Sequence, residues 1–165
     1  MRGRQRRAAA TLAVCALLAA CGFHLQGAMR LPPAFAATYL ESADRYTDLH
    51  RALGEALTLA GAGLVQDRQA AGATVELLSE DSGQRVLSVS AQNTPTEYEV
   101  YYTVRYRVRV AGREVLTPQT LTLTRDYSFN ETALLAKERE RDNLRGALAR
   151  QLAALILRRL AALPP

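Results

Sequence analysis

Apolar and polar residues alternate along one long segment in the middle of the chain. From Glu97 to Val110 every second residue is a tyrosine or a valine, and most residues between them are charged or polar. A period of two over this length predicts a long β-strand with one buried face. The predicted buried residues are Tyr98, Val100, Tyr102, Val104, Tyr106, Val108 and Val110. We expect the three tyrosines to belong to the core, with ligand binding as the alternative.

Strand-like segments flank this one on both sides. Thr74 to Leu78 and Arg85 to Ser90 have strand composition and are separated by a polar bend at Asp81–Gly83. Beyond the long strand, a turn at Ala111–Glu114 leads into an alternating segment from Thr120 to Tyr127. The short connections predict antiparallel neighbours.

Two other segments have the period of an α-helix. Asp48 to Ala60 carries leucines at a spacing of four, with Thr47 as a suitable N-cap and Gly61 or Gly63 as a suitable terminator. A longer helix runs to about Leu163, and its N-cap is either Ser128, in a capping box with Glu131, or Asn130.

The order of elements predicts the fold. A short strand from Phe35 to Leu40 comes first, followed by a helix, three strands and the long helix. We therefore expect an α+β two-layer sandwich with two helices packed on one face of a four-stranded, mostly antiparallel sheet. Arg105, Arg107 and Arg109 fall on the other sheet face, which stays free of helix. Such a polar face must meet either water or a polar partner.

The N-terminus resembles a lipoprotein signal. Four arginines precede an apolar segment, Ala8 to Ala20, that is too short to span a bilayer, and Leu18–Cys21 resembles a lipobox. We expect residues 1–20 to be a signal peptide that is removed, 21–34 a lipidated tether and 35–165 a single domain. Cys21 would then carry a diacylglycerol thioether and an N-acyl group. The alternative is a buried N-terminal helix that ends in cysteine.

Charge and composition argue against several classes of function. The net charge of +5 falls to +1 once the leader arginines are removed, leaving 17 basic and 16 acidic residues, which disfavours a nucleic-acid partner. Lipidation of Cys21 and loss of Cys15 leave no thiol for a disulfide. His24 and His50 have no ligand at metal-binding spacing, and no nucleophile or phosphate-loop motif occurs. We expect no enzyme activity, no metal and no cofactor.

Several short motifs together resemble one protein family. They are the opening Cys21–Gly27 joined to Leu31–Pro32, the strand entry Glu97–Tyr98, and Ala136–Lys137 after the corner at Tyr127–Asn130. In this order they resemble the LptE family, the lipopolysaccharide-assembly lipoproteins of Gram-negative outer membranes. The resemblance implies two helices on a four-stranded sheet and a 1:1 complex with the outer-membrane β-barrel LptD. It also implies that the protein plugs and helps to assemble this barrel, faces the periplasm within the lumen, and binds lipopolysaccharide.

The resemblance implies where lipopolysaccharide would bind. The family uses basic residues near one end of the sheet, and one of them matches Lys137. The other lies in the turn that enters the long strand, where this sequence has Ala91–Asn93. Arg85 is a nearby candidate to replace it. A charge on a solvated helix surface is the alternative for Lys137.

The arginine row on the long strand has its own two interpretations. A polar barrel lumen would explain the helix-free polar face, so Arg105, Arg107 and Arg109 are candidate barrel contacts. Their guanidinium groups are also suited to hold anions. Alternatively, they are exposed charges that prevent strands from associating.

Two other functions remain open at this point. One is a free-standing, periplasm-facing carrier of lipid or lipopolysaccharide, which needs a cavity lined by large apolar residues. The other is a lipoprotein subunit of a different envelope complex. Outer-membrane lipid is a partner through the N-terminal anchor in each case.

Overall fold

The computed structural model describes residues 29–128 and 134–164, and they form a five-stranded sheet covered by helices. The strands are β1 (Ala37–Ser42), β2 (Gly63–Leu64), β3 (Ala73–Val89), β4 (Pro95–Val110) and β5 (Arg113–Ser128). The helices are α2 (Asp48–Leu59), α3 (Leu134–Ala161) and the short 3₁₀ turns η1 (Pro33–Ala36) and η2 (Arg68–Ala70). The strand order is β2-β1-β3-β4-β5.

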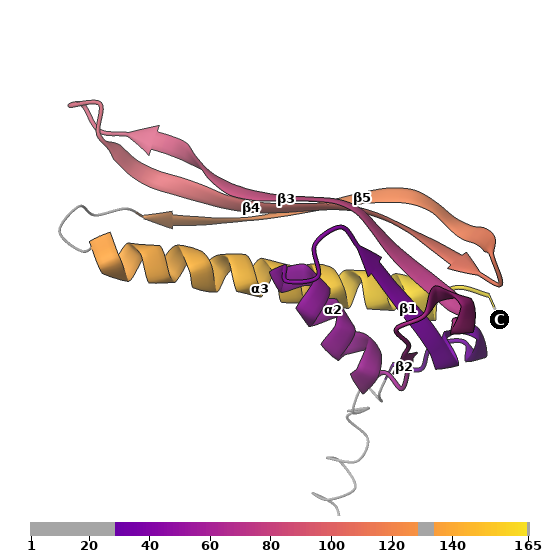
Figure 1. Ribbon diagram of the computed structural model, residues 1–165. Helices are drawn as coiled ribbons and strands as arrows, with labels where there is room; N and C mark the ends of the chain where they lie inside the picture. The colour runs from indigo at the N-terminus through magenta and orange to yellow at the C-terminus, as the bar shows by residue number, and fades with distance from the viewer. Residues whose placement is uncertain (1–28, 129–133, 165) are drawn as a thin grey trace, which may run out of the picture.

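Both long helices lie on the same side of the sheet, so the predicted two-layer α+β arrangement is confirmed (Figure 1). The three long strands are antiparallel, and β1 runs parallel to β3. The predicted number of four strands is wrong, because β2 adds a fifth strand parallel to β1. This strand has two residues, which is too short to produce a readable period.

The strand expected to begin at Phe35 begins two residues later, because residues 33–36 form the turn η1. Pro33 fixes the backbone angle suited to such a turn. The Thr38 hydroxyl donates a 2.7 Å hydrogen bond to the Phe35 carbonyl and holds the turn against the strand.

The long central strand is confirmed, and its tyrosine and valine face is the buried one. Val100, Tyr102, Val104, Tyr106 and Val108 are all at most 3% exposed, whereas Tyr98 and Val110 at the two ends are half-buried. The predicted turn after this strand is also present as a two-residue hairpin connection. Ala111 and Gly112 both have positive φ, as a tight hairpin of this type requires.

The polar bend predicted at Asp81–Gly83 is wrong, because β3 continues through it. Asp81 pairs with Thr103 and Gly83 with Tyr101 in the ladder with β4. Pairing with a strongly strand-forming neighbour overrides the weak local strand preference of these residues. Gly83 also makes room for the Tyr101 ring, since a Cβ there would lie 2.8 Å from the Tyr101 hydroxyl oxygen.

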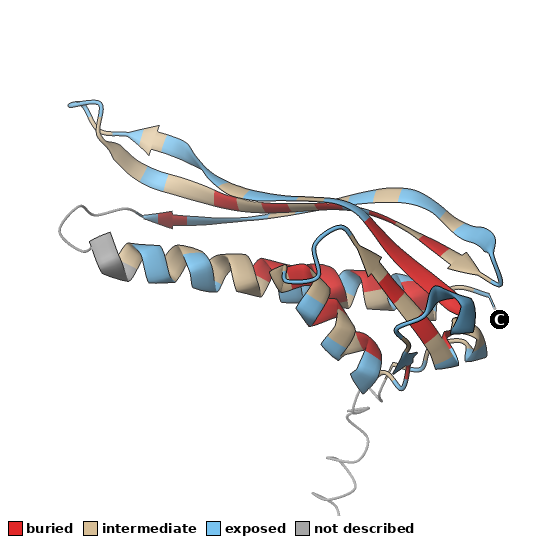
Figure 2. Ribbon diagram, in the orientation of Figure 1, coloured by how far each residue is buried: buried red, intermediate tan, exposed pale blue. Residues whose placement is uncertain are grey.

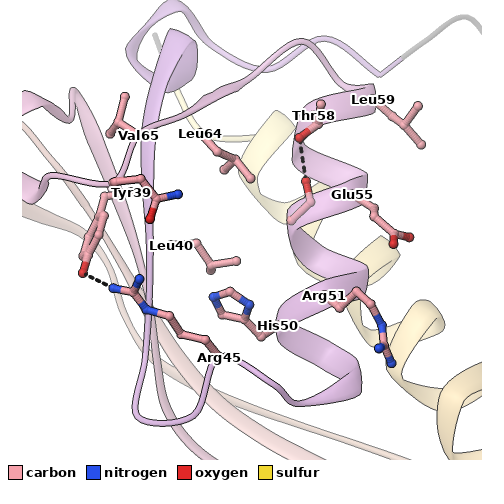
Figure 3. A pocket seen from close by; sticks show the side chains of 12 residues that line it. Tyr39, Leu40, Arg45, His50, Arg51, Glu55, Thr58, Leu59, Leu64 and Val65 are labelled. Carbon is pink, nitrogen blue, oxygen red and sulfur yellow. Dashed lines mark hydrogen bonds between the residues drawn. The ribbon is translucent and has the colours of Figure 1, made fainter.

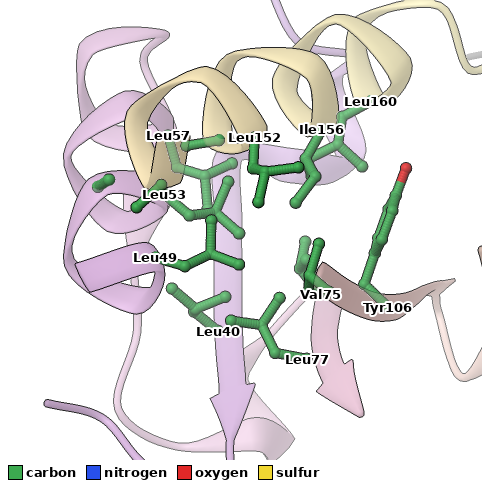
Figure 4. Close-up of a cluster of buried hydrophobic side chains, with 14 of the residues drawn as sticks. Leu40, Leu49, Leu53, Leu57, Val75, Leu77, Tyr106, Leu152, Ile156 and Leu160 are labelled. Carbon is green, nitrogen blue, oxygen red and sulfur yellow. The ribbon is translucent and has the colours of Figure 1, made fainter. Parts of the chain in front are cut away.

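The core lies between the sheet and its helices, with α2 packed on the side of β1 and β2 and α3 on the side of β4 and β5 (Figures 2 and 4). Leucines at the predicted spacing of four on α2 are fully buried there, together with an apolar stripe of α3. The largest fully buried side chains of these helices are Leu49, Leu53, Leu57, Leu148, Leu152, Ile156 and Leu160. The two helices also contact each other directly through an ion pair, with Arg145 Nε 3.0 Å from Asp48 Oδ2.

The start of α2 is fixed to the sheet by a small polar network. The Thr47 hydroxyl accepts a 3.1 Å bond from the His50 backbone N–H, which confirms the predicted N-cap. The same hydroxyl donates to Glu80 of β3, and Tyr102 of β4 donates to the other Glu80 oxygen at 2.7 Å. Burial and this bond to Glu80 raise the pKa of the Tyr102 hydroxyl well above its usual value.

Gly61 follows α2 with φ +90 and ends the helix, as one of the two predicted terminators.

Among the described residues, neither helix is long and apolar enough to cross a bilayer. The predicted signal peptide, Cys21 and most of the tether lie outside the described residues, and so do Asn130 and Glu131 at the predicted N-cap of α3.

Candidate functional site

Lys137 lies in the first turns of α3 and packs against the end of β5. Its ammonium nitrogen is 5.9 Å from the centre of the Tyr127 ring and 2.7 Å from Glu140 Oε2. The side chain is 18% exposed, so it is held in place while part of it still contacts water. An ammonium group has three donors, and Glu140 occupies one of them. Lys137 can therefore donate to an added anion without leaving its position.

Two stacked tyrosines form the surface under Lys137. The rings of Tyr98 and Tyr127 have centroids 5.8 Å apart and are nearly parallel. The Tyr127 hydroxyl donates a 2.9 Å bond to the Gln84 side chain of β3, so all three long strands take part. Burial raises the pKa of the Tyr127 hydroxyl, although the nearby Arg141 and Lys137 cations act in the opposite direction. A cation on such a ring is stabilised by the electron-rich face.

Arg85, the second candidate for lipopolysaccharide binding, lies on the opposite face of the sheet. It pairs in register with Glu99, and its Nη2 lies 2.5 Å from Glu99 Oε1. Its neighbour Val86 is opposite Tyr98, on the face that carries Lys137. The fold therefore does not bring Lys137 and Arg85 together on one face.

The turn that enters β4 is short and uncharged. The Ser90 N–H donates 2.8 Å to the Thr94 carbonyl, and the Asn93 N–H donates 2.9 Å to the Ser90 carbonyl. Asn93 has φ 63, a conformation that asparagine tolerates better than most residues. Ala91–Asn93 thus form the tip of the β3–β4 hairpin without adding a cation.

The arginine row lies on the helix-free face, but two of its members already bind a carboxylate of the same chain. Glu76 of β3 has only 5% of its side chain exposed. Arg107 Nε lies 2.6 Å from its Oε2, and Arg109 Nε lies 3.3 Å from its Oε1. Arg68 adds a third guanidinium group at 3.2 Å from Oε1. A nearly buried charge needs such partners.

Sequence reasoning did not find Glu76. The signal was present, since Glu76 is a lone acid within the otherwise apolar strand Val75–Leu78. An acid in a buried strand requires a cation on the neighbouring strand, and the arginine row supplies it.

Arg105 is different from the other two arginines of the row. It is exposed, and it lies opposite Ser79 on one side and Thr120 on the other. In the next register step, the hydroxyls of Thr103 and Thr122 are 2.9 Å apart. Within the described strands, this middle part of the helix-free face is an exposed polar surface with one cation that has no ion pair.

The described residues contain no group of three histidine, cysteine, aspartate or glutamate side chains placed to hold a metal ion. The side chains of the two surfaces described above make hydrogen bonds and ion pairs. The Lys137 region is suited to an anion beside aromatic rings, and the helix-free face is suited to a polar surface of another molecule.

Comparisons with known proteins agree on one family. The family model for lipopolysaccharide assembly, LptE, matches residues 35–160. The LPS-assembly lipoprotein LptE of Pectobacterium atrosepticum is 30% identical over 145 residues, which cover 87% of this chain and 78% of the relative. That of Yersinia enterocolitica is 29% identical over 143 residues, covering 86% of this chain and 69% of the relative.

A solved structure supports the same assignment. The solution structure of lipoprotein B from Nitrosomonas europaea has a TM-score of 0.71 with 26% identity, and the match covers 86% of this chain and 91% of that one. The match to the family model and the fold agree over the whole body of the domain. The chain therefore belongs to the LptE family of lipopolysaccharide-assembly lipoproteins.

Proposed function

We propose that this envelope lipoprotein is the plug subunit of the outer-membrane lipopolysaccharide translocon. In this role it sits within the LptD β-barrel in a 1:1 complex, assists assembly of that barrel, and binds lipopolysaccharide during delivery to the cell surface. Membership of the LptE family supports the general assignment to lipopolysaccharide assembly. The more specific parts of the proposal are that LptD is the partner and that this protein binds lipopolysaccharide.

The observation that carries the barrel contact is the helix-free face of β3, β4 and β5. It exposes hydroxyls and Arg105, while Arg107 and Arg109 share the Glu76 carboxylate and Arg107 also lies 3.9 Å from Glu114 Oε2. When a face of paired charges and hydroxyls docks against another polar surface, the cost in desolvation free energy is small, because few isolated charges must leave water. Within the row, we therefore expect Arg105 to be the direct barrel contact, whereas Arg107 and Arg109 stabilise the face.

The ligand part of the proposal rests on Lys137. Its ammonium nitrogen lies over the Tyr127 ring, which stacks on the Tyr98 ring. Phosphate groups of lipopolysaccharide are suited to this cation, and the rings can support the sugar or acyl portion next to it. Arg85 is bound to Glu99 on the other face, so we assign it at most an independent second contact.

The anchoring part of the proposal rests on the N-terminal sequence. Lipidation of Cys21 would attach the domain to the outer membrane on its periplasmic side, since three acyl chains bind a bilayer essentially permanently.

The carrier alternative needs space for acyl chains between the layers. In the described part of the chain that space is filled by leucine, isoleucine, valine and tyrosine side chains (Figure 4). A mainly apolar groove does lie beside α2 (Figure 3), so our preference for the plug rests on the match to the LptE family.

Photocrosslinking in living cells tests the docking face. A photoreactive phenylalanine at Arg105 or Thr122 should form an adduct with the large barrel. The same probe at Arg150, on the exposed surface of α3, serves as the matched control. Strong adducts from Arg150 with none from the two sheet positions would contradict docking through the helix-free face.

A further inference from the structure

The groove between α2 and the β1 edge of the sheet has no part in the proposed function (Figure 3). Its volume is about 710 Å³, which is within the range of pockets that hold small ligands. Leu40 and Gly54 lie at its floor, and Leu59 and Leu64 line one end. His50 lies toward the other end. The groove is mainly apolar and open to solvent, so a ligand can enter it from outside.

Polar groups on both walls of the groove have partners within the domain. On the β1 side, the Leu40 carbonyl accepts a hydrogen bond from the His50 ring. On the α2 side, the Thr58 hydroxyl donates a 2.9 Å bond to the Gly54 carbonyl. A peptide strand added here would find the Leu40 carbonyl already bonded, and some of its own backbone groups would lack partners. A hydrocarbon chain needs no hydrogen bonds, so the groove is better suited to an acyl chain than to a peptide.

The length and depth of the groove match a single acyl chain. From His50 to Leu59 the helix rises by roughly 14 Å. One acyl chain fills half of a bilayer core that is ~30 Å thick, which is about 15 Å. Gly54 adds depth at the middle of this length. A Cβ there would lie 3.5 Å from Leu64 Cδ1, an ordinary contact, so the packing of the domain does not itself require glycine.

A cation lies at the His50 end of the groove. The Arg45 Nη2 donates a 3.1 Å bond to the Tyr39 hydroxyl, which leaves other guanidinium donors available, and Arg45 has no ion pair with any described residue. The other charged residues of the lining, Arg51 and Glu55, lie on the side of α2 that is turned toward α3. An apolar groove with a cation at one end is complementary to a hydrocarbon chain with an anionic headgroup.

We propose that this groove binds a long-chain fatty acid, with its carboxylate at the Arg45 guanidinium and its chain along α2 toward Leu59 and Leu64. A guanidinium group holds a carboxylate through two parallel hydrogen bonds. Because the Tyr39 hydroxyl accepts from Arg45, its own proton is left to donate to the same anion. The groove is separate from the Lys137 region and from the helix-free face of β3, β4 and β5, so the inference does not depend on LptD or on lipopolysaccharide.

The test uses the full lipoprotein, purified from membranes in a maltoside detergent, and a photoreactive palmitate with a diazirine on its chain. Illumination and peptide mass spectrometry should find adducts in α2, β1 and β2. Palmitate should compete with the probe, and hexadecanol, which has the same chain without the charge, should compete about fivefold less well. Arg45→Gln should reduce competition by palmitate to the level of hexadecanol. The matched control Arg158→Gln, on the exposed surface of α3, should leave it unchanged.

Two further variants test the apolar part of the groove. Gly54→Leu fills its floor and should abolish the adducts while thermal unfolding stays cooperative. Should Gly54→Leu fail to fold, Leu59→Asp decides the question, because the Leu59 side chain is 84% exposed and its replacement leaves the core intact. This variant should reduce labelling severalfold.

Four results would overturn the proposal. Palmitate and hexadecanol compete equally, Arg45→Gln and Arg158→Gln behave alike, or the adducts fall outside the groove. In the fourth, the detergent, a phospholipid or lipopolysaccharide displaces the probe and palmitate does not.

Discussion

The ammonium group of Lys137 is held between the ring of Tyr127, 5.9 Å from its centre, and the Glu140 carboxylate at 2.7 Å. Two elements, the end of β5 and the first turns of α3, are joined by this contact. A solvated helix charge, the alternative for this residue, would not be expected to have two fixed partners and only 18% exposure. The environment of Lys137 is that of a positioned cation with donors still available.

Reversing the charge at this position should weaken lipopolysaccharide binding. Lys137→Asp removes the cation and places a carboxylate beside Glu140, so we expect affinity to fall about tenfold, the equivalent of about 1.4 kcal/mol. Copurified or titrated lipopolysaccharide measures the effect. Lys137→Arg should keep most of the binding, and Arg141→Gln, one turn further along α3, should change it little. Equal binding by Lys137→Asp and the unchanged chain would remove Lys137 from the ligand site.

Removing the nearly buried Glu76 carboxylate should destabilise the fold. Glu76→Gln keeps the shape but leaves Arg68, Arg107 and Arg109 without their shared counter-charge. Because these arginines are partly exposed, we expect a loss of about 2–3 kcal/mol rather than more. Urea unfolding of the purified domain measures it. Glu41→Gln, which removes an exposed partner of Arg68, should cost at most about 0.5 kcal/mol. A similar effect from both variants would mean that Glu76 is not the centre of this cluster.

His50 should make stability depend on pH in mildly acidic solution. Burial and then the nearby Arg45 guanidinium lower the pKa of His50 below its ordinary value of 6.5, although Glu80 and Asp44 act in the opposite direction. The unfolded chain therefore binds more protons at this residue than the native chain does. The stability that neutral His50 contributes to the fold is therefore fully present above about pH 6.5, and it is lost as the pH falls through the lowered pKa of His50.

Urea midpoints at about pH 7.5 and about pH 5 measure the contribution of His50 when the unchanged chain is compared with His50→Gln. The variant should lose less stability between the two values than the unchanged chain loses. A larger loss in His50→Gln would reverse the assigned direction.

The two glycines around α2 should respond in opposite ways to alanine. Gly54→Ala adds a methyl group at an ordinary packing distance inside a helix, so stability should rise by about 0.5–1 kcal/mol. Gly61→Ala forces a side chain onto a backbone with φ +90 and should lower stability by about 1 kcal/mol. Thermal or urea unfolding compares them directly. A destabilised Gly54→Ala would show that the packing around Leu40 and Leu64 requires the glycine.

The strongest periodic segments were predictable from the sequence because a single packing face determines them. The period of two in β4 and the leucine spacing of α2 both follow from burial on one side. β2 could not be predicted, since two residues carry no period. The continuity of β3 through Asp81–Gly83 could not be predicted either, because it depends on pairing with β4 rather than on local preference.

The face on which Arg85 lies shows the same limit at the candidate site. Val75 and Leu77 face the helices, so simple alternation would place Arg85 on that face with Lys137. A β-bulge between Leu77 and Ser79 shifts the alternation by one residue, and Arg85 then faces the other way. Single-sequence patterns do not reveal a bulge, so the two candidate cations could not be separated before the fold was known.

The central claim, that this lipoprotein is the plug of the lipopolysaccharide translocon, is tested most directly by stoichiometric copurification. Affinity-tagged protein is extracted from outer membranes in detergent, washed stringently, and its bound partners are identified and quantified by mass spectrometry. The account predicts one large β-barrel at equal stoichiometry, with markedly reduced recovery from the variant Arg105→Glu. Recovery of the lipoprotein with copurified lipid and no barrel would contradict the account and favour the free-standing carrier.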